Sequence, residues 1–171
     1  MTVSRSIWDP VIRVFHWTVA FAFLLNFFFL EEGADPHEFA GYYILCAVAV
    51  RFVWGILGSK NARFVNFFPS ISGIKQHIQA LRSGKIPEED GHNPVGALMV
   101  FALLLGLTVT GLSGWGLDGL FWGEDWAETL HEVAANITFS LVVVHVFAVV
   151  IFSILGPRNL ILQMLSGRIS K

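Results

Sequence analysis

Long runs of apolar residues alternate with short polar connections along this chain. The four longest runs predict helices at about residues 11–30, 38–57, 94–114 and 128–155. Each approaches or exceeds the roughly 20 residues that a helix needs to cross the hydrocarbon core of a bilayer. The last run is the clearest, because no charged residue occurs between Val133 and Leu155. The pattern predicts an all-α integral membrane protein, a bundle of four transmembrane helices.

Three of these runs begin with the same local signal. Asp9-Pro10, Asp35-Pro36 and Asn93-Pro94 each place a capping side chain before a proline. Asp and Asn favour the position before a helix, and proline fits its first turn. The fourth helix is predicted to start near Asp125 and to stop at Gly156-Pro157.

The connection from Gly58 to Asn93 is the longest, and it contains a shorter helical pattern. Apolar residues recur at helical spacing beside polar ones at about residues 71–83. This predicts an amphipathic helix on the membrane surface. His77 falls on this helix, where we expect a solvated side chain, and Pro87–Gly91 reads as a polar loop.

Composition supports the membrane assignment. Of the 171 residues, 54% are hydrophobic and only 14% are charged, whereas about a quarter are charged in a typical soluble domain. The single cysteine, Cys46, excludes an internal disulfide and the Cys-x-x-Cys-His attachment of a c-type haem. No cleavable signal pattern is present. We expect one membrane-embedded domain over residues 1–171, with lipid as a partner, no nucleic-acid partner and a possible homodimer.

The basic residues predict the orientation of the chain. Ten of the 11 Lys and Arg residues flank the predicted spans on one side, and the connections on the other side are acidic. Cytoplasmic segments carry the excess of Lys and Arg in membrane proteins. Both termini are therefore expected in the cytoplasm.

Two histidines, His131 and His145, stand fourteen residues apart on the last predicted span. Fourteen residues come within about 40° of whole helical turns and cover roughly 21 Å, so both imidazoles face one side at different depths. Ligand-capable side chains inside a bilayer are costly and usually functional. Two of them on one face suggest two stacked cofactors.

Depth pairs each of these histidines with one on another span. His16 matches His145 near the cytoplasmic side, and His37 matches His131 near the outer side. Two neutral imidazoles from opposite helices provide the axial ligands of a six-coordinate haem. The sequence thus favours two b-type haems between the helices; the alternative for His37 or His131 alone is an interfacial side chain exposed to water.

Other residues are candidates for contacts with these cofactors. Arg51 shares the face of His37 at the depth of the inner pair and could hold a haem propionate, or it could reach the headgroups. Arg13 is a propionate candidate or a lipid-phosphate contact. Gly41, one turn after His37, would let a porphyrin approach the backbone. His92 could meet a propionate or a quinone, or it could be part of an ordinary capping loop.

The chain resembles the prokaryotic cytochrome b561 and nickel–iron hydrogenase cytochrome b superfamily over essentially its whole length. The matching pieces, in order, are Arg13-Val14-Phe15-His16-Trp17, His37-Glu38-Phe39-Ala40-Gly41, Arg51-Phe52-Val53-Trp54-Gly55, Ala62-Arg63-Phe64, Gly91-His92-Asn93-Pro94-Val95-Gly96-Ala97, and the pair His131 and His145. The resemblance implies four core helices, with two b-type haems bound by the first, second and fourth. Members move electrons between quinones and partner redox proteins.

The expected function is therefore transmembrane electron transfer between the quinone pool and a redox partner, such as a periplasmic c-type cytochrome. No acid–base or nucleophilic catalytic group is convincingly assembled. Whether this electron-transfer cytochrome b is also an enzyme, such as a quinone-linked oxidoreductase, is left open. One alternative is a superoxide:quinone oxidoreductase, in which superoxide reduces the outer haem and quinone accepts the electron. Another is a haem or metal carrier.

Overall fold

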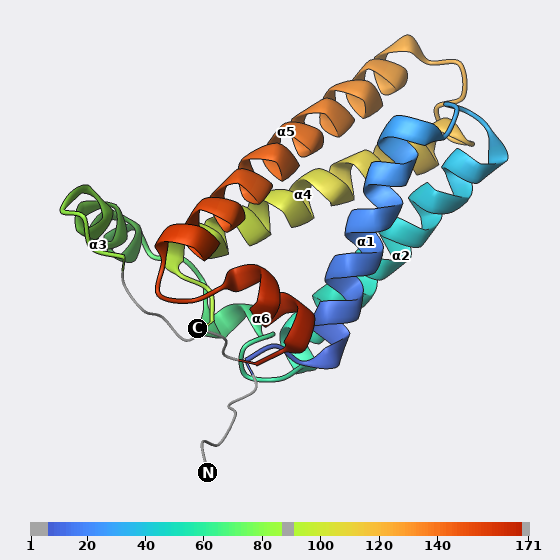
Figure 1. Ribbon diagram of the computed structural model, residues 1–171. Helices are drawn as coiled ribbons and strands as arrows, with labels where there is room; N and C mark the ends of the chain where they lie inside the picture. Colours follow the sequence, from blue (N-terminus) through green and yellow to red (C-terminus); the bar gives the residue numbers. More distant parts are fainter. Residues whose placement is uncertain (1–6, 87–90, 169–171) are drawn as a thin grey trace. The chain divides into compact units, whose positions relative to one another are not determined.

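The computed structural model describes residues 7–86 and 91–168, and its regular elements in these ranges are helices (Figure 1). Arg5, Lys171 and most of the predicted loop at Pro87–Gly91 lie outside the described residues. Four helices are long: α1 (Pro10–Phe29), α2 (Asp35–Leu57), α4 (Pro94–Leu117) and α5 (Asp125–Leu155). Three are short: the 3-10 helix η1 (Phe64–Asn66), α3 (Ile71–Arg82) and α6 (Leu160–Ser166). The predicted all-α class is confirmed.

The four long helices are each long and apolar enough to cross a membrane, with mean hydropathies of 1.6, 1.7, 2.3 and 2.6 in chain order. At most 22% of each apolar window is buried inside the protein. Large apolar side chains such as Phe21, Phe147 and Ile154 therefore point outward. Outward apolar faces of this extent suit lipid, and the prediction of four membrane spans is confirmed.

The predicted start signals are correct for two helices and displaced for one. The Asp9 carboxylate accepts a hydrogen bond from the Ile12 amide at 3.0 Å, and the Asn93 side chain accepts one from the Gly96 amide at 2.7 Å. Helix α2 begins at Asp35 itself, so this residue stands inside the helix rather than before it. Asp9 and Asn93 thus satisfy amides that have no partner within their own helices.

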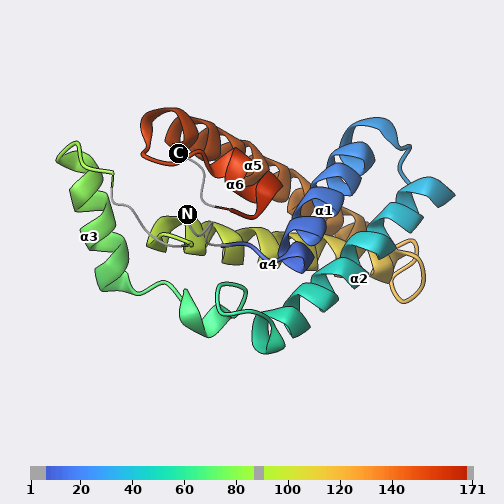
Figure 2. The same ribbon diagram turned by 60° about the horizontal axis from the view of Figure 1, so that its bottom comes forward.

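The chain forms two compact units, which we describe separately. One unit, here called the central unit, comprises residues 14–52 and 102–142. Within it α1 and α2 run antiparallel and are joined by a short turn (Figures 1 and 2). Its apolar core contains Val19, Ala22 and Phe23 of α1, Ile44 and Val48 of α2, and Leu107 of α4.

Glycines on α4 allow the helices of the central unit to approach closely. A Cβ atom at Gly106 would lie 2.5 Å from the Thr138 hydroxyl oxygen, and one at Gly111 would lie 3.1 Å from Leu45 Cδ1. Small residues at such crossings are typical of membrane bundles, where packing rather than the hydrophobic effect holds the helices together.

The other unit, here called the end unit, comprises residues 1–13, 53–101 and 143–171. Its core contains Ile7, Trp8, Ile12 and Ala62. Helix α6 is attached to this core: the Ile7 amide donates to the Gly167 carbonyl at 2.8 Å. The Arg13 guanidinium donates to the carbonyls of Met164, at 3.2 Å, and Leu165. A cation at carbonyls in a helix's last turn is favourable.

Two local features differ from the sequence-based expectations. Helix α6 was not predicted, although Asn159 caps its start and Gly167 ends it with a φ of 75°. His77 on α3 was expected to be solvated, and that is wrong, because only 5% of it is exposed. Helix α3 itself matches the predicted range to one residue.

Asp9 joins the start of α1 to the segment that follows α2 within the end unit. Its carboxylate accepts hydrogen bonds from Trp54 Nε1 at 3.2 Å and from the Ser59 hydroxyl. Burial raises the pKa of the Asp9 carboxyl, but hydrogen bonds from Ser59, the Ile12 amide, Trp54 and the Val11 amide outweigh it. The pKa is therefore held below its ordinary value of 3.8.

Replacing Asp9 by Ala is expected to destabilise the detergent-solubilised protein by about 1 kcal/mol at pH 7, the usual effect of removing a capping side chain. Because the folded-state pKa is depressed, the contribution of Asp9 is complete above the unfolded-state pKa and is lost as pH falls through the folded value. The stability difference between parent and variant should therefore shrink below about pH 4. Thermal unfolding against pH measures this, with Asp35→Ala as the control, and an equal effect at Asp35 would contradict the role of Asp9.

Candidate functional site

Two of the predicted ligands, His37 at the start of α2 and His131 on α5, lie together in the central unit. Their ring centres are 6.2 Å apart, and the ring planes meet at 68°. A transition metal binds an imidazole nitrogen at about 2.0–2.1 Å, and adding roughly 1.1 Å from nitrogen to ring centre on each side gives about 6.3 Å. The observed separation therefore fits one metal atom between the two rings.

The hydrogen bonds of His131 define which of its nitrogens is available. Its Nδ1 lies 3.0 Å from the Thr110 carbonyl oxygen and 3.2 Å from the Ser113 hydroxyl, both on α4. A carbonyl can only accept, so Nδ1 carries the hydrogen and Nε2 keeps its lone pair. This tautomer is the one that a metal ligand binding through Nε2 requires.

Gly114, one turn further along α4, gives the His131 ring its space. A Cβ atom at this position would lie 2.9 Å from His131 Cε1 and 3.2 Å from Nδ1. Real Cβ atoms do not approach a ring so closely, so any other residue would displace the imidazole. Helix α4 supplies no candidate ligand itself. It nevertheless orients the His131 ring on α5 through Thr110, Ser113 and Gly114.

His37 has a different environment. Its Nδ1 is buried and has no hydrogen-bond partner among the described residues. Its backbone carbonyl accepts a hydrogen bond from the side-chain amide of Asn26 on α1, at 3.2 Å. Sequence reasoning did not single out Asn26, although an amide in the apolar second half of α1 is a visible signal, because a buried polar group needs a partner.

The second predicted pair has one histidine in each of the two units, and the pairing stays a prediction. His16 belongs to the central unit, where its ring meets Trp17 edge-on with centres 5.0 Å apart. His145 belongs to the end unit and is half-buried on α5.

Arg51 and Gly41 lie on α2 in surroundings that suit the cofactor contacts expected of them. Only 4% of Arg51 is exposed, whereas a side chain reaching out to lipid headgroups would be exposed. At Gly41 a Cβ atom would meet nothing within 4 Å, so there is open space beside this turn of the helix. Contacts of these residues with a porphyrin stay predictions.

Arg13 and His92 have contacts within the end unit that the sequence did not indicate. The Arg13 guanidinium binds the carbonyls of α6 described above, so a propionate would compete with them. The His92 ring lies between Trp8 and Phe67, with ring centres at 4.7 and 4.4 Å. Its predicted contact with a propionate or quinone stays a prediction.

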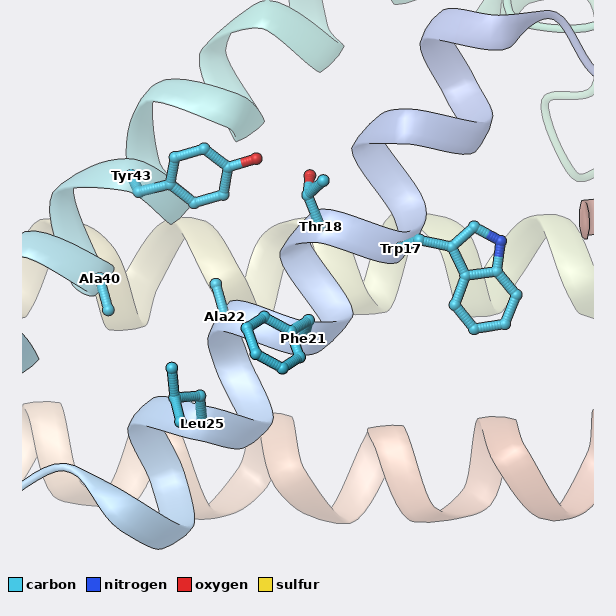
Figure 3. A pocket seen from close by; sticks show the side chains of 7 residues that line it. All are labelled: Trp17, Thr18, Phe21, Ala22, Leu25, Ala40 and Tyr43. Carbon is cyan, nitrogen blue, oxygen red and sulfur yellow. The ribbon is translucent and has the colours of Figure 1, made fainter.

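A hollow of about 480 Å³ opens between α1 and α2 in the central unit (Figure 3). Its walls are apolar apart from the hydroxyls of Thr18 and Tyr43 and the indole of Trp17. Figure 3 shows the Tyr43 hydroxyl directed toward the side of the hollow on which Thr18 stands. Tyr43 is 45% exposed, and the structure shows no hydrogen bond from its hydroxyl to another described residue.

Within residues 7–86 and 91–168, no group of three or more His, Cys, Asp or Glu side chains is placed to hold a metal ion. The donor set that the structure offers is a pair of histidines on facing helices. Membrane-spanning helices with such a pair are characteristic of membrane cytochromes b.

Comparison with known proteins leads to the same class. The family model described as prokaryotic cytochrome b561 matches residues 7–167, and the chain belongs to this family. It is also 23% identical, over 96% of its length and 80% of the relative's, to a probable Ni/Fe-hydrogenase B-type cytochrome subunit of Rhodobacter capsulatus. No solved structure matches it. The protein is thus a haem-binding b-type cytochrome of the membrane, in a family that transfers electrons across it.

Replacing Gly114 by Ala is expected to push the His131 ring out of position and to lower the haem content of the purified protein by up to half. The added methyl group collides with the imidazole itself, so helix content should stay unchanged. Pyridine haemochrome quantification together with circular dichroism measures both. Gly119→Ala is the matched control, because a Cβ atom there meets nothing within 4 Å. Full haem content in Gly114→Ala would contradict the packing role of this glycine.

Proposed function

We propose that the protein carries electrons across the bacterial inner membrane through two b-type haems, each bound by two histidines. His37 and His131 bind the outer haem, and His16 and His145 bind the inner haem. The observation that carries the proposal is the pairing of His37 with His131 at 6.2 Å between ring centres. The hydrogen bond from His131 Nδ1 to the Thr110 carbonyl supports it, because it leaves Nε2 free to bind a metal.

The remaining residues hold and orient the cofactors. Arg51 binds a propionate of the inner haem, with Arg13 and His92 as further candidates, and Gly41 provides room for the outer porphyrin. Bound haem supplies one-electron reduction and oxidation at its iron. Two histidines held at each iron would leave no position open for O₂, which favours electron transfer over oxygen chemistry.

The proposed topology places both termini in the cytoplasm, in accordance with the basic residues that flank the spans on that side. The outer connections carry Glu31, Glu32, Asp118, Glu124 and Asp125. An acidic outer surface attracts a basic partner and raises its association rate. A periplasmic c-type cytochrome is the redox partner that this charge favours.

Replacing each of the four histidines in turn by Ala is expected to remove one of two haems. The parent should bind two haems per chain by pyridine haemochrome quantification, and each variant about one. His37→Ala and His131→Ala should remove the same haem, with the same reduction potential. His77→Ala is the matched control, since His77 is also buried but has no proposed ligand role. Two haems in every variant, or one in the parent, would contradict the two-haem arrangement.

The quinone pool is the proposed membrane partner, and the hollow between α1 and α2 is where we place the quinone. A quinone needs an apolar channel for its tail and hydrogen-bond donors for its carbonyls, and the hollow provides apolar walls with the hydroxyl of Tyr43. A phenol without a partner in a lipid-facing position is costly, and a ligand carbonyl would satisfy it. Trp17 lines the hollow and also contacts the ring of His16.

Replacing Tyr43 by Phe is expected to raise the KM for a quinol roughly fivefold, the effect of losing one hydrogen bond of about 1 kcal/mol. Haem content and reduction potentials should stay unchanged. Steady-state quinol oxidation with an artificial electron acceptor measures the effect. Tyr42→Phe is the matched control, because the neighbouring Tyr42 hydroxyl donates to Asp118 instead. Equal KM values in the parent and Tyr43→Phe would exclude this site for the quinone.

A further inference from the structure

Two buried polar atoms without partners belong to neighbouring residues where α1 and α2 meet in the central unit. The Asn26 amide nitrogen donates to the His37 backbone carbonyl at 3.2 Å, which ties the two residues together. The other atom of the amide, Asn26 Oδ1, is buried and has no hydrogen-bond partner among the described residues, and the same holds for His37 Nδ1. Buried polar atoms are nearly always paired, so each of these exceptions needs an explanation.

The chemistry of the two atoms is complementary once His37 binds a metal. A side-chain amide oxygen can only accept a hydrogen bond. A neutral histidine that binds a metal through Nε2 carries its hydrogen at Nδ1 and becomes a donor there. We propose that Asn26 is a positioning residue, whose Oδ1 accepts the hydrogen of His37 Nδ1 when His37 binds the outer haem. This inference rests on the proposed outer haem site.

The neighbouring ligand shows the same arrangement already complete. His131 Nδ1 donates to the carbonyl of Thr110, so a backbone group fixes that ring. For His37 the proposed acceptor is the oxygen of a side-chain amide, whose nitrogen already donates to the His37 carbonyl. The two ligands of one haem would thus be oriented by different means: His131 by the Thr110 carbonyl and the Ser113 hydroxyl, and His37 by the Asn26 side chain.

The proposed hydrogen bond affects the iron through its ligand. A hydrogen bond from Nδ1 makes the imidazole more basic, and such outer contacts commonly change affinity or activity 10- to 100-fold. A more basic ligand favours the oxidised over the reduced iron. Removing the acceptor should weaken that preference about tenfold, which for a one-electron couple corresponds to ~59 mV toward a higher reduction potential.

The test is a redox titration of the full-length protein in its holo form, with Asn26→Leu compared with the parent. The outer haem is identified as the haem that His131→Ala removes. Its reduction potential should rise by ~59 mV, which corresponds to the tenfold change, while the potential of the inner haem stays unchanged. Asn136→Leu is the matched control, because its amide donates only to the Glu132 carbonyl of its own helix. An unchanged outer potential in Asn26→Leu, or an equal rise in Asn136→Leu, would overturn the proposal.

A conservative variant decides the case if Asn26→Leu does not retain the outer haem. Asn26→Gln keeps an amide oxygen, so retention in Gln together with loss in Leu supports the proposal, and loss in both overturns it. A failure of the proposed function can be distinguished from a failure of this inference. It would appear as fewer than two haems in the parent, or as two haems in His131→Ala. In neither case would Asn26 have been altered.

Discussion

The hydrogen bond between His131 Nδ1 and the Thr110 carbonyl determines the chemistry of the central unit. Inside an apolar span an imidazole has no water to satisfy it, so each ring nitrogen needs a partner from the protein or a ligand. The Thr110 carbonyl is the partner of Nδ1, which leaves the lone pair of Nε2 available to a ligand. The ring of His37 lies at 6.2 Å between centres, so the two imidazoles together form the proposed haem site.

Helix α4 shows how a span without a candidate ligand can still shape the proposed haem site. It provides a carbonyl at Thr110, a hydroxyl at Ser113 and a missing side chain at Gly114, all against the His131 ring. The same helix packs closely on α5 through Gly106 and Thr138. Its interior face therefore combines tight packing with the orientation of an imidazole, and neither task requires a charged residue.

The sequence predicted the elements of this structure better than their contacts. Apolar runs located the four long helices, because a span must be both long and apolar, and depth along the helices placed His37 level with His131. Contacts that depend on tertiary packing could not be predicted in this way: the Thr110 carbonyl and the Asn26 amide have no pattern linking them to their histidines. His77 was predicted to be solvated from the polar residues beside it in sequence, whereas its burial depends on what packs against α3. Helix α6 was missed because Gly156-Pro157 was interpreted only as a stop.

The attachment of α6 changes the meaning of the residues after the last span. By sequence they only follow the predicted stop of the last span at Gly156-Pro157. In the end unit, however, the Gly167 carbonyl holds the Ile7 amide, and Met164 packs on the cluster around Trp8 and Ile12. The segment around Ile7 and Trp8 thus has no complete set of neighbours until Met164 and Gly167 have been synthesised. Assembly of this unit must wait for the synthesis of α6.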